Sequence, residues 1–174
     1  IVVTRDRFET NGTSVQIEVT LNPGGAVPVA HVHGSVEEYF EVLEGQVTFM
    51  LDGTEQVLRA GESVTVKAGT PHVPSNPSAA PARFRVTLTP PGDLDMCLVQ
   101  VHNFLSSGSE APGSLHTLFQ MTRYASAYDI YLTGIPITLQ QLGIWLITPT
   151  LRMLGYQPWS AQYAMRNHPP ARKP

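Results

Sequence analysis

Short segments of alternating apolar and polar residues constrain the fold of this chain more than any other feature of its sequence. The clearest is SVQIEVTL, residues 14–21, in which Val15, Ile17 and Val19 share one face and polar side chains occupy the other. Alternation with a period of two is typical of a strand with one buried face. Similar segments follow at regular spacing up to residue 104, and turn residues separate them. The pattern predicts a mainly β sandwich or closed barrel and disfavours a parallel α/β sheet.

The turns and the alternation together predict the individual strands. Asp52-Gly53 is a strong signal for a hairpin between two of them. The strands predicted after the first are residues 38–45, 46–51, 54–61, 62–69, 82–92 and 95–104.

The sequence changes character after residue 105. Small and polar residues predict a linker, and apolar residues at helical spacing then predict two helices, over 115–128 and 136–156. We expect the helices to pack on the barrel or on a partner chain, and the alternatives are a lid over the barrel mouth and a membrane-surface role. The predicted organisation is a β-barrel, a linker and a C-terminal helical extension: residues 1–105, 106–114 and 115–174.

Charge and cysteine content restrict the expected partners and compartment. The net charge is −3 and no basic block or stripe stands out, so we do not expect nucleic acid as a partner. The single cysteine, Cys97, cannot form an internal disulfide, which favours a cytoplasmic location. Polar residues interrupt the apolar stretch of the second predicted helix, so no membrane span is expected.

Residues 31–40, HVHGSVEEYF, contain the first candidates for chemistry. Residues i and i+2 of a strand point the same way, so His31 and His33 are expected to project together. Two imidazoles on one face can share a divalent cation, although exposed strand histidines are common without one. A third histidine, His72, follows a tight turn at residues 68–71 and, taken alone, is interpreted as a loop histidine.

The same parity argument separates the two adjacent glutamates. Glu38 shares a face with the apolar residues Phe40 and Val42, so we predict that its carboxylate points inward. A lone buried carboxylate is costly unless it is paired or bound to a metal. Glu37 shares the other face with Tyr39 and is predicted to point to solvent.

The spacing of these residues resembles the two motifs of the cupin superfamily over roughly residues 14–104. The first motif, G-x5-H-x-H-x3,4-E-x6-G, is matched by Gly25, His31, His33, Glu38 and Gly45. The second motif, G-x5-P-x-G-x2-H-x3-N, is matched by Gly61, Gly69, His72 and Asn76. Lys67 stands where the family usually has proline, at a position that shapes a turn and binds no metal.

The resemblance implies a double-stranded β-helix barrel of jelly-roll type, and the two predicted helices add a C-terminal α-helical extension to it. It further implies one divalent transition metal per chain, which can be Fe, Mn, Ni, Zn or Cu, since ligand type alone does not choose among them. Cupins are often dimers, and the apolar C-terminal helices can extend such an interface, so a homodimer is expected. The implied metal ligands are His31, His33, Glu38 and His72.

The activity that the resemblance implies is that of a dioxygenase-like oxidoreductase. Its substrate is expected to be a small, fairly hydrophobic molecule that chelates the metal through two oxygens, with Glu38 serving as ligand and base. Two alternatives stay open: a non-catalytic binding or sensing protein, and a sugar isomerase or epimerase. A sugar isomerase or epimerase usually needs additional basic residues around the metal, and Arg83 and Arg85 are the only arginines of the later predicted strands. Candidates for lining the pocket, each also explained by an ordinary core or surface position, are Phe40, Phe49, Met50 and His102.

Overall fold

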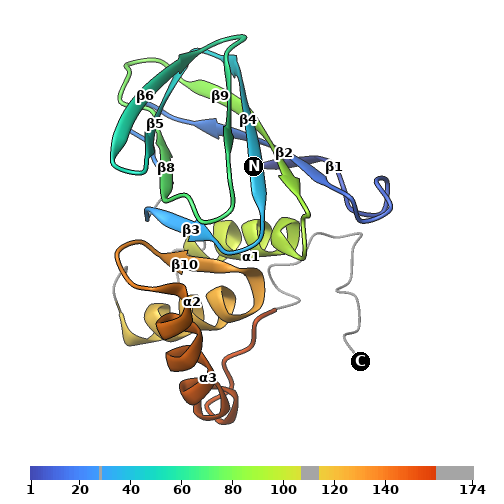
Figure 1. Cartoon of the computed structure of the whole chain (residues 1–174), viewed down its shortest axis with the longest axis vertical. Helices are drawn as coiled ribbons and strands as arrows, with labels where there is room; N and C mark the ends of the chain where they lie inside the picture. Colours follow the sequence, from blue (N-terminus) through green and yellow to red (C-terminus); the bar gives the residue numbers. More distant parts are fainter. Residues whose placement is uncertain (28, 107–113, 160–174) are drawn as a thin grey trace. The chain divides into compact units, whose positions relative to one another are not determined.

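A computed structural model describes residues 1–27, 29–106 and 114–159 of the chain (Figure 1). The chain divides into two compact units. The first comprises Ile1–Gly92 together with Ile130–Ile135, and the second comprises Asp93–Asp129 together with Pro136–Pro174. The predicted linker lies outside the described residues except at its two ends.

The first unit contains two five-stranded sheets in which all neighbouring strands are antiparallel, which confirms the mainly β prediction. The strands of one sheet, in spatial order, are β1 (Val2–Arg5), β2 (Val15–Leu21), β9 (Ala82–Thr89), β4 (Glu37–Glu44) and β7 (Ser63–Val66).

The second sheet contains the other strands and includes one from the C-terminal part of the chain. In spatial order they are β10 (Ile130–Leu132), β3 (His31–His33), β8 (His72–Ser75), β5 (Gln46–Leu51) and β6 (Thr54–Arg59). The sequence did not indicate β10, because three residues are too few for an alternation to be recognised.

Alternating residues of the strands form the core of this unit. Along β9, for example, Phe84, Val86 and Leu88 are buried, while the intervening arginine and threonine side chains are only partly covered. On β2, Val15 and Ile17 are fully buried in the same way. Removal of these apolar side chains from water is the main favourable contribution to folding of such a sheet pair.

The second unit is helical and contains α1 (Leu94–Ser106), α2 (Leu115–Tyr128) and α3 (Ile137–Met153). The two helices predicted after the linker are thereby confirmed. Ser114 is the N-cap of α2, and its hydroxyl accepts a hydrogen bond of 3.1 Å from the backbone N–H of Thr117. None of the helices in the described ranges has the length and apolar character that a membrane crossing requires.

The strand predicted over residues 95–104 is wrong, because this segment belongs to helix α1. Its residues are apolar at both parities, so periodicity could not distinguish a buried strand from a buried helix. The buried positions follow the helical period instead: Leu94, Cys97, Gln100 and Phe104.

Helix α3 leaves several leucines exposed to solvent. Leu139, Leu142 and Leu146 lie at helical spacing and expose 57%, 53% and 61% of their surface. This face is the part of the chain to which the expectation of a homodimer applies, and the homodimer stays a prediction.

Candidate metal centre

Strand β3 places two imidazoles on the same face of its sheet. His31 and His33 project together, with ring centroids 5.1 Å apart, and the intervening Val32 is buried. The backbone N–H of Gly69 donates a hydrogen bond of 2.8 Å to the carbonyl of His33. This bond ties the end of β3 to the turn that precedes the third histidine.

Strand β4 separates the two adjacent glutamates as predicted. Glu38 is buried together with Phe40, whereas Tyr39 exposes 44% of its surface. Glu37 instead forms a surface ion pair of 2.5 Å with the ammonium group of Lys67. Lys67 stands at the position where the cupin motif usually has proline, so the substitution adds a partner for Glu37 and leaves Glu38 in the interior.

His72 begins strand β8, so the interpretation of this residue as a loop histidine is wrong. It is buried and lies directly opposite His31 in the antiparallel register of β8 and β3. The turn before it contains Gly69, whose φ of 83° is a conformation that favours glycine. The preceding turn and the pairing with β3 therefore direct the imidazole toward the other two histidines.

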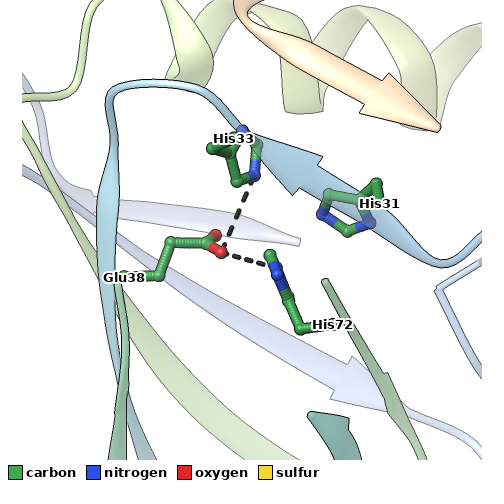
Figure 2. Close-up of side chains that lie close together, drawn as sticks. All are labelled: His31, His33, Glu38 and His72. Atoms are coloured by element: carbon green, nitrogen blue, oxygen red, sulfur yellow. Dashed lines mark ion pairs between the residues drawn. The ribbon is translucent and has the colours of Figure 1, made fainter. Parts of the chain in front are cut away.

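Four side chains from three strands meet in this unit (Figure 2). The atoms that can bind a metal ion in His31, His33, Glu38 and His72 all lie within 4.8 Å of one another. Glu38 Oε2 lies 2.6 Å from His72 Nε2 and 3.6 Å from His33 Nε2. Strand β4 brings the carboxylate from one sheet, and β3 and β8 bring the imidazoles from the other.

Backbone carbonyls determine which imidazole nitrogens face the centre. His31 Nδ1 lies 2.9 Å from the carbonyl of Val29, and His72 Nδ1 lies 3.0 Å from the carbonyl of Thr70. A carbonyl only accepts hydrogen bonds, so each Nδ1 carries the hydrogen and each Nε2 offers a lone pair. Metal-binding histidines are usually oriented by this kind of outer hydrogen bond.

Two buried atoms at the centre have no hydrogen-bond partner among the described residues. They are Glu38 Oε2 and His72 Nε2, which lie 2.6 Å from each other and form an ion pair when His72 is protonated. A buried acceptor without a partner is costly, and a proton or a metal cation shared by the two atoms removes that cost. The residues present therefore fit a metal ion with three imidazole ligands and one carboxylate ligand.

The charge states of the four residues suit a cation. Burial, together with the neighbouring His72 and His33, lowers the pKa of His31 to about 4, which keeps its imidazole neutral near pH 7. Burial opposes ionisation of Glu38, but the adjacent imidazoles outweigh it and lower the pKa of this carboxyl. Because the opposing effect of burial is outweighed by that of the Glu38 carboxylate, the pKa of His72 is raised above its ordinary value.

These shifts predict how metal affinity depends on pH. A metal ion must displace the proton of His72, so affinity is expected to rise as the pH increases through the raised pKa of His72 and to level off above it. Titration of the imidazole Cε1–H resonances of the metal-free protein should place the midpoint of His72 above 6.5 and that of His31 near 4. A midpoint near 6.5 for His31 would contradict the burial argument.

Three buried phenylalanines pack against one another, and one of them, Phe40, lies beside the candidate ligand His72. The Phe40 ring centroid is 6.1 Å from that of His72, 4.9 Å from that of Phe49 and 5.7 Å from that of Phe84. We call these three residues the phenylalanine cluster. Phe84 was missed by the sequence interpretation, although its place among the alternating apolar residues of β9 indicated an inward side chain.

Two of the predicted pocket-lining residues lie elsewhere. Met50 exposes 39% of its surface and points to the opposite face of β5 from the buried Phe49. Adjacent residues of a strand point to opposite faces, so both could not line the interior. His102 is an exposed residue of α1, in the helical unit, because the strand on which it was placed is a helix.

Basic side chains of the first unit lie outside its core. Arg83 and Arg85 both bind the carboxylate of Glu18 at 2.7 Å, and they also approach Glu44 and Glu41 on the polar face of the sheet. No arginine or lysine within the described residues of the first unit is buried: Arg5, Arg7, Arg59, Lys67, Arg83 and Arg85.

A family model and several solved structures are similar to part of this chain. The family model of the cupin domain matches residues 17–89. A Thermus thermophilus protein of solved structure is 32% identical, with 45% of this chain and 74% of that chain covered and a TM-score of 0.43. An uncharacterized conserved protein with a double-stranded β-helix domain from Klebsiella pneumoniae is 25% identical, with coverages of 45% and 69% and a TM-score of 0.43.

A third solved structure is a sugar phosphate isomerase of the cupin superfamily from Silicibacter pomeroyi. It is 27% identical, with 50% of this chain and 57% of that chain covered and a TM-score of 0.45. A search of the curated proteins finds no match to this chain.

Proposed function

Since this chain belongs to the cupin family through residues 17–89, we propose that it is a metal-dependent, dioxygenase-like oxidoreductase. Its proposed substrate is a small, fairly hydrophobic molecule that chelates a metal through two oxygens. The observation that carries this proposal is the buried cluster of His31, His33, Glu38 and His72, in which two facing atoms have no hydrogen-bond partner among the described residues.

We propose that the four residues hold one divalent transition metal per chain. Three imidazoles and a carboxylate suit Fe(II), Mn(II), Ni(II), Zn(II) and Cu(II), and geometry and availability decide among them. Such an ion, when bound, supplies Lewis-acid or redox chemistry and coordination positions for a chelating substrate or dioxygen. The carbonyls of Val29 and Thr70 keep two of the imidazoles in the tautomer that this role requires.

Glu38 is the proposed base as well as a ligand. Its lowered pKa keeps the carboxylate charged near neutral pH, so it can accept a proton from the enol or phenol hydroxyl of the substrate. Its carboxylate comes from β4 and meets the imidazoles of β3 and β8.

The surroundings of the cluster favour an apolar substrate over a phosphorylated sugar. The phenylalanine cluster approaches His72 through Phe40, and its buried rings reduce the access of water to that side of the site. A phosphate group needs cationic partners. Arg83 and Arg85 are already paired with glutamates on the polar face of their sheet, so this alternative has less support.

Oxygen consumption tests the proposed activity. Protein loaded anaerobically with Fe(II) is expected to consume dioxygen with at least one member of a panel of flavonols, diketones and catechols, and to bind close to one metal ion per chain. His33→Ala should abolish both metal binding and oxygen uptake, while Glu37→Ala, in the surface pair with Lys67, should leave both unchanged. A flat response from metal-loaded protein across the panel would favour the non-catalytic binding or sensing alternative.

A further inference from the structure

Strand β10 belongs to the sheet that holds the three histidines, although it follows the cupin match by some forty residues of chain. It pairs with β3 along its whole length: Ile130 lies opposite His33, Tyr131 opposite Val32 and Leu132 opposite His31. Within the described residues, β8 on the other side pairs with β3 only at His31 and His72. The strand that carries two of the four candidate ligands is therefore held mainly by β10.

The register determines which side chains of β10 face the metal centre. Directly opposite residues of an antiparallel pair project to the same face of the sheet, with Cβ atoms about 4.5–5.5 Å apart. Ile130 and Leu132 therefore share the face of His33 and His31, whereas the buried Tyr131 lies on the opposite face.

One row of side chains crosses the sheet at this level, from the C-terminal strand to the ligands. Leu132 lies opposite His31, His31 lies opposite His72, and His72 lies opposite Leu51. Figure 2 shows β10, drawn in pale orange, alongside β3, the strand of His31 and His33. The row places an aliphatic side chain of β10 next to a candidate ligand.

The side chains of Ile130 and Leu132 are not completely covered by neighbouring residues. Leu132 exposes 50% of its surface and Ile130 is half-buried, whereas the candidate ligands Glu38 and His72 are buried. An apolar group of a bound molecule that covers Leu132 removes further apolar surface from water, and this contribution is proportional to the area covered.

We propose that Ile130 and Leu132 are specificity-determining residues of the metal centre. They contact the apolar body of a molecule whose oxygens are bound at the ligands, and they favour ligands with a larger apolar body. This inference rests on the proposed function, because it requires a ligand that combines a chelating head with an apolar body.

The position of the two residues can be tested without any activity. Full-length protein with labelled methyl groups is titrated with Mn²⁺, whose unpaired electrons broaden nearby resonances. The methyl signals of Ile130 and Leu132 should disappear as the site fills, while those of Val57, on the opposite face of the same sheet, persist. Bound Mn²⁺ that leaves the Ile130 and Leu132 signals sharp would overturn the inference alone, and absence of Mn²⁺ binding would refute the proposed function with it.

Ligand selectivity tests the role itself. Zn²⁺-loaded protein is titrated with pentane-2,4-dione and with dibenzoylmethane, which share a chelating head and differ in apolar size. Leu132→Asn is expected to lower the affinity for dibenzoylmethane about fivefold to tenfold, because it removes part of one aliphatic contact. The affinities for pentane-2,4-dione and for Zn²⁺ should stay within about twofold of the wild-type values. The matched control Val57→Asn, where the side chain is 38% exposed, should change none of these affinities.

The outcomes separate this inference from the proposed function. If Leu132→Asn lowers the affinities for both diketones equally, or lowers neither, the selectivity role is overturned and the proposed function remains intact. Metal-loaded wild-type protein that binds neither diketone would refute the proposed chelating substrate and, with it, this inference.

Discussion

Glu38→Ala is expected to lower the affinity of the chain for Zn²⁺ by at least about 100-fold, whereas Glu37→Ala leaves it within about twofold. Residues that only support metal ligands already change affinity by about 10–100-fold, so loss of a ligand should exceed that range. Glu38 contributes the carboxylate oxygen that lies within 4.8 Å of the three imidazole nitrogens. Glu37 is one residue away but points to the surface, where it pairs with Lys67.

Calorimetric titration of metal-free protein measures this difference directly. Glu38→Gln keeps the volume of the side chain and removes its charge, so it distinguishes loss of the ligand from a cavity in the core. His72→Ala, which removes a ligand on the other sheet, should cause a similar loss of Zn²⁺ affinity. Circular dichroism of each variant verifies that it folds. Equal losses for Glu37→Ala and Glu38→Ala would refute the parity argument on which the site was first identified.

Asn76→Ala is expected to lower the free energy of unfolding by about 2–4 kcal/mol, because it leaves several buried polar groups without partners. Asn76 is fully buried, and its Nδ2 donates hydrogen bonds to the carbonyls of Leu21, at 3.0 Å, and Ala80, at 2.8 Å. Its Oδ1 accepts bonds from the backbone N–H and the hydroxyl of Ser78. One amide therefore joins the ends of β2 and β8 to the loop before β9.

Urea unfolding of the metal-free protein tests this expectation separately from metal binding. Ser78→Ala removes a single hydroxyl from the same network and should cost about 1 kcal/mol or less. Asn22→Ala, at an exposed asparagine nearby, should remain within about 0.5 kcal/mol of the parent protein. Asn76→Asp keeps the acceptor and removes the donors, so it should also destabilise. A loss below about 1 kcal/mol for Asn76→Ala would show that the network is not an important contribution to stability.

Asn76 also illustrates what a motif match explains and what it leaves out. Its spacing from His72 identified it as the last residue of the second cupin motif, and nothing in the spacing assigned it a role. Its side chain bonds to residues 55 and 54 positions earlier in the chain, Leu21 and Asn22. Such contacts depend on how the strands assemble, which local patterns do not reveal.

Prediction from the sequence succeeded where a local rule decided the outcome. The period of two separated Glu38 from Glu37 and placed Phe40 in the interior. The assignment of Met50 to the pocket was wrong because it ignored this period and placed two adjacent residues of one strand on the same face. The period of two failed over residues 95–104, where apolar residues at both parities fit a buried helix as well as a strand.

The sequence by itself therefore determined the mainly β class, the cupin resemblance and the identity of the four candidate ligands, because strand parity and motif spacing are local properties of the chain. Only the tertiary structure decided that β4 of one sheet brings Glu38 to within 2.6 Å of His72 on β8 of the other. It also decided that β10 lies beside the ligands of β3. Pairing between strands that are distant in sequence depends on burial of their shared faces, and three residues such as Ile130–Leu132 contain too little pattern to specify it.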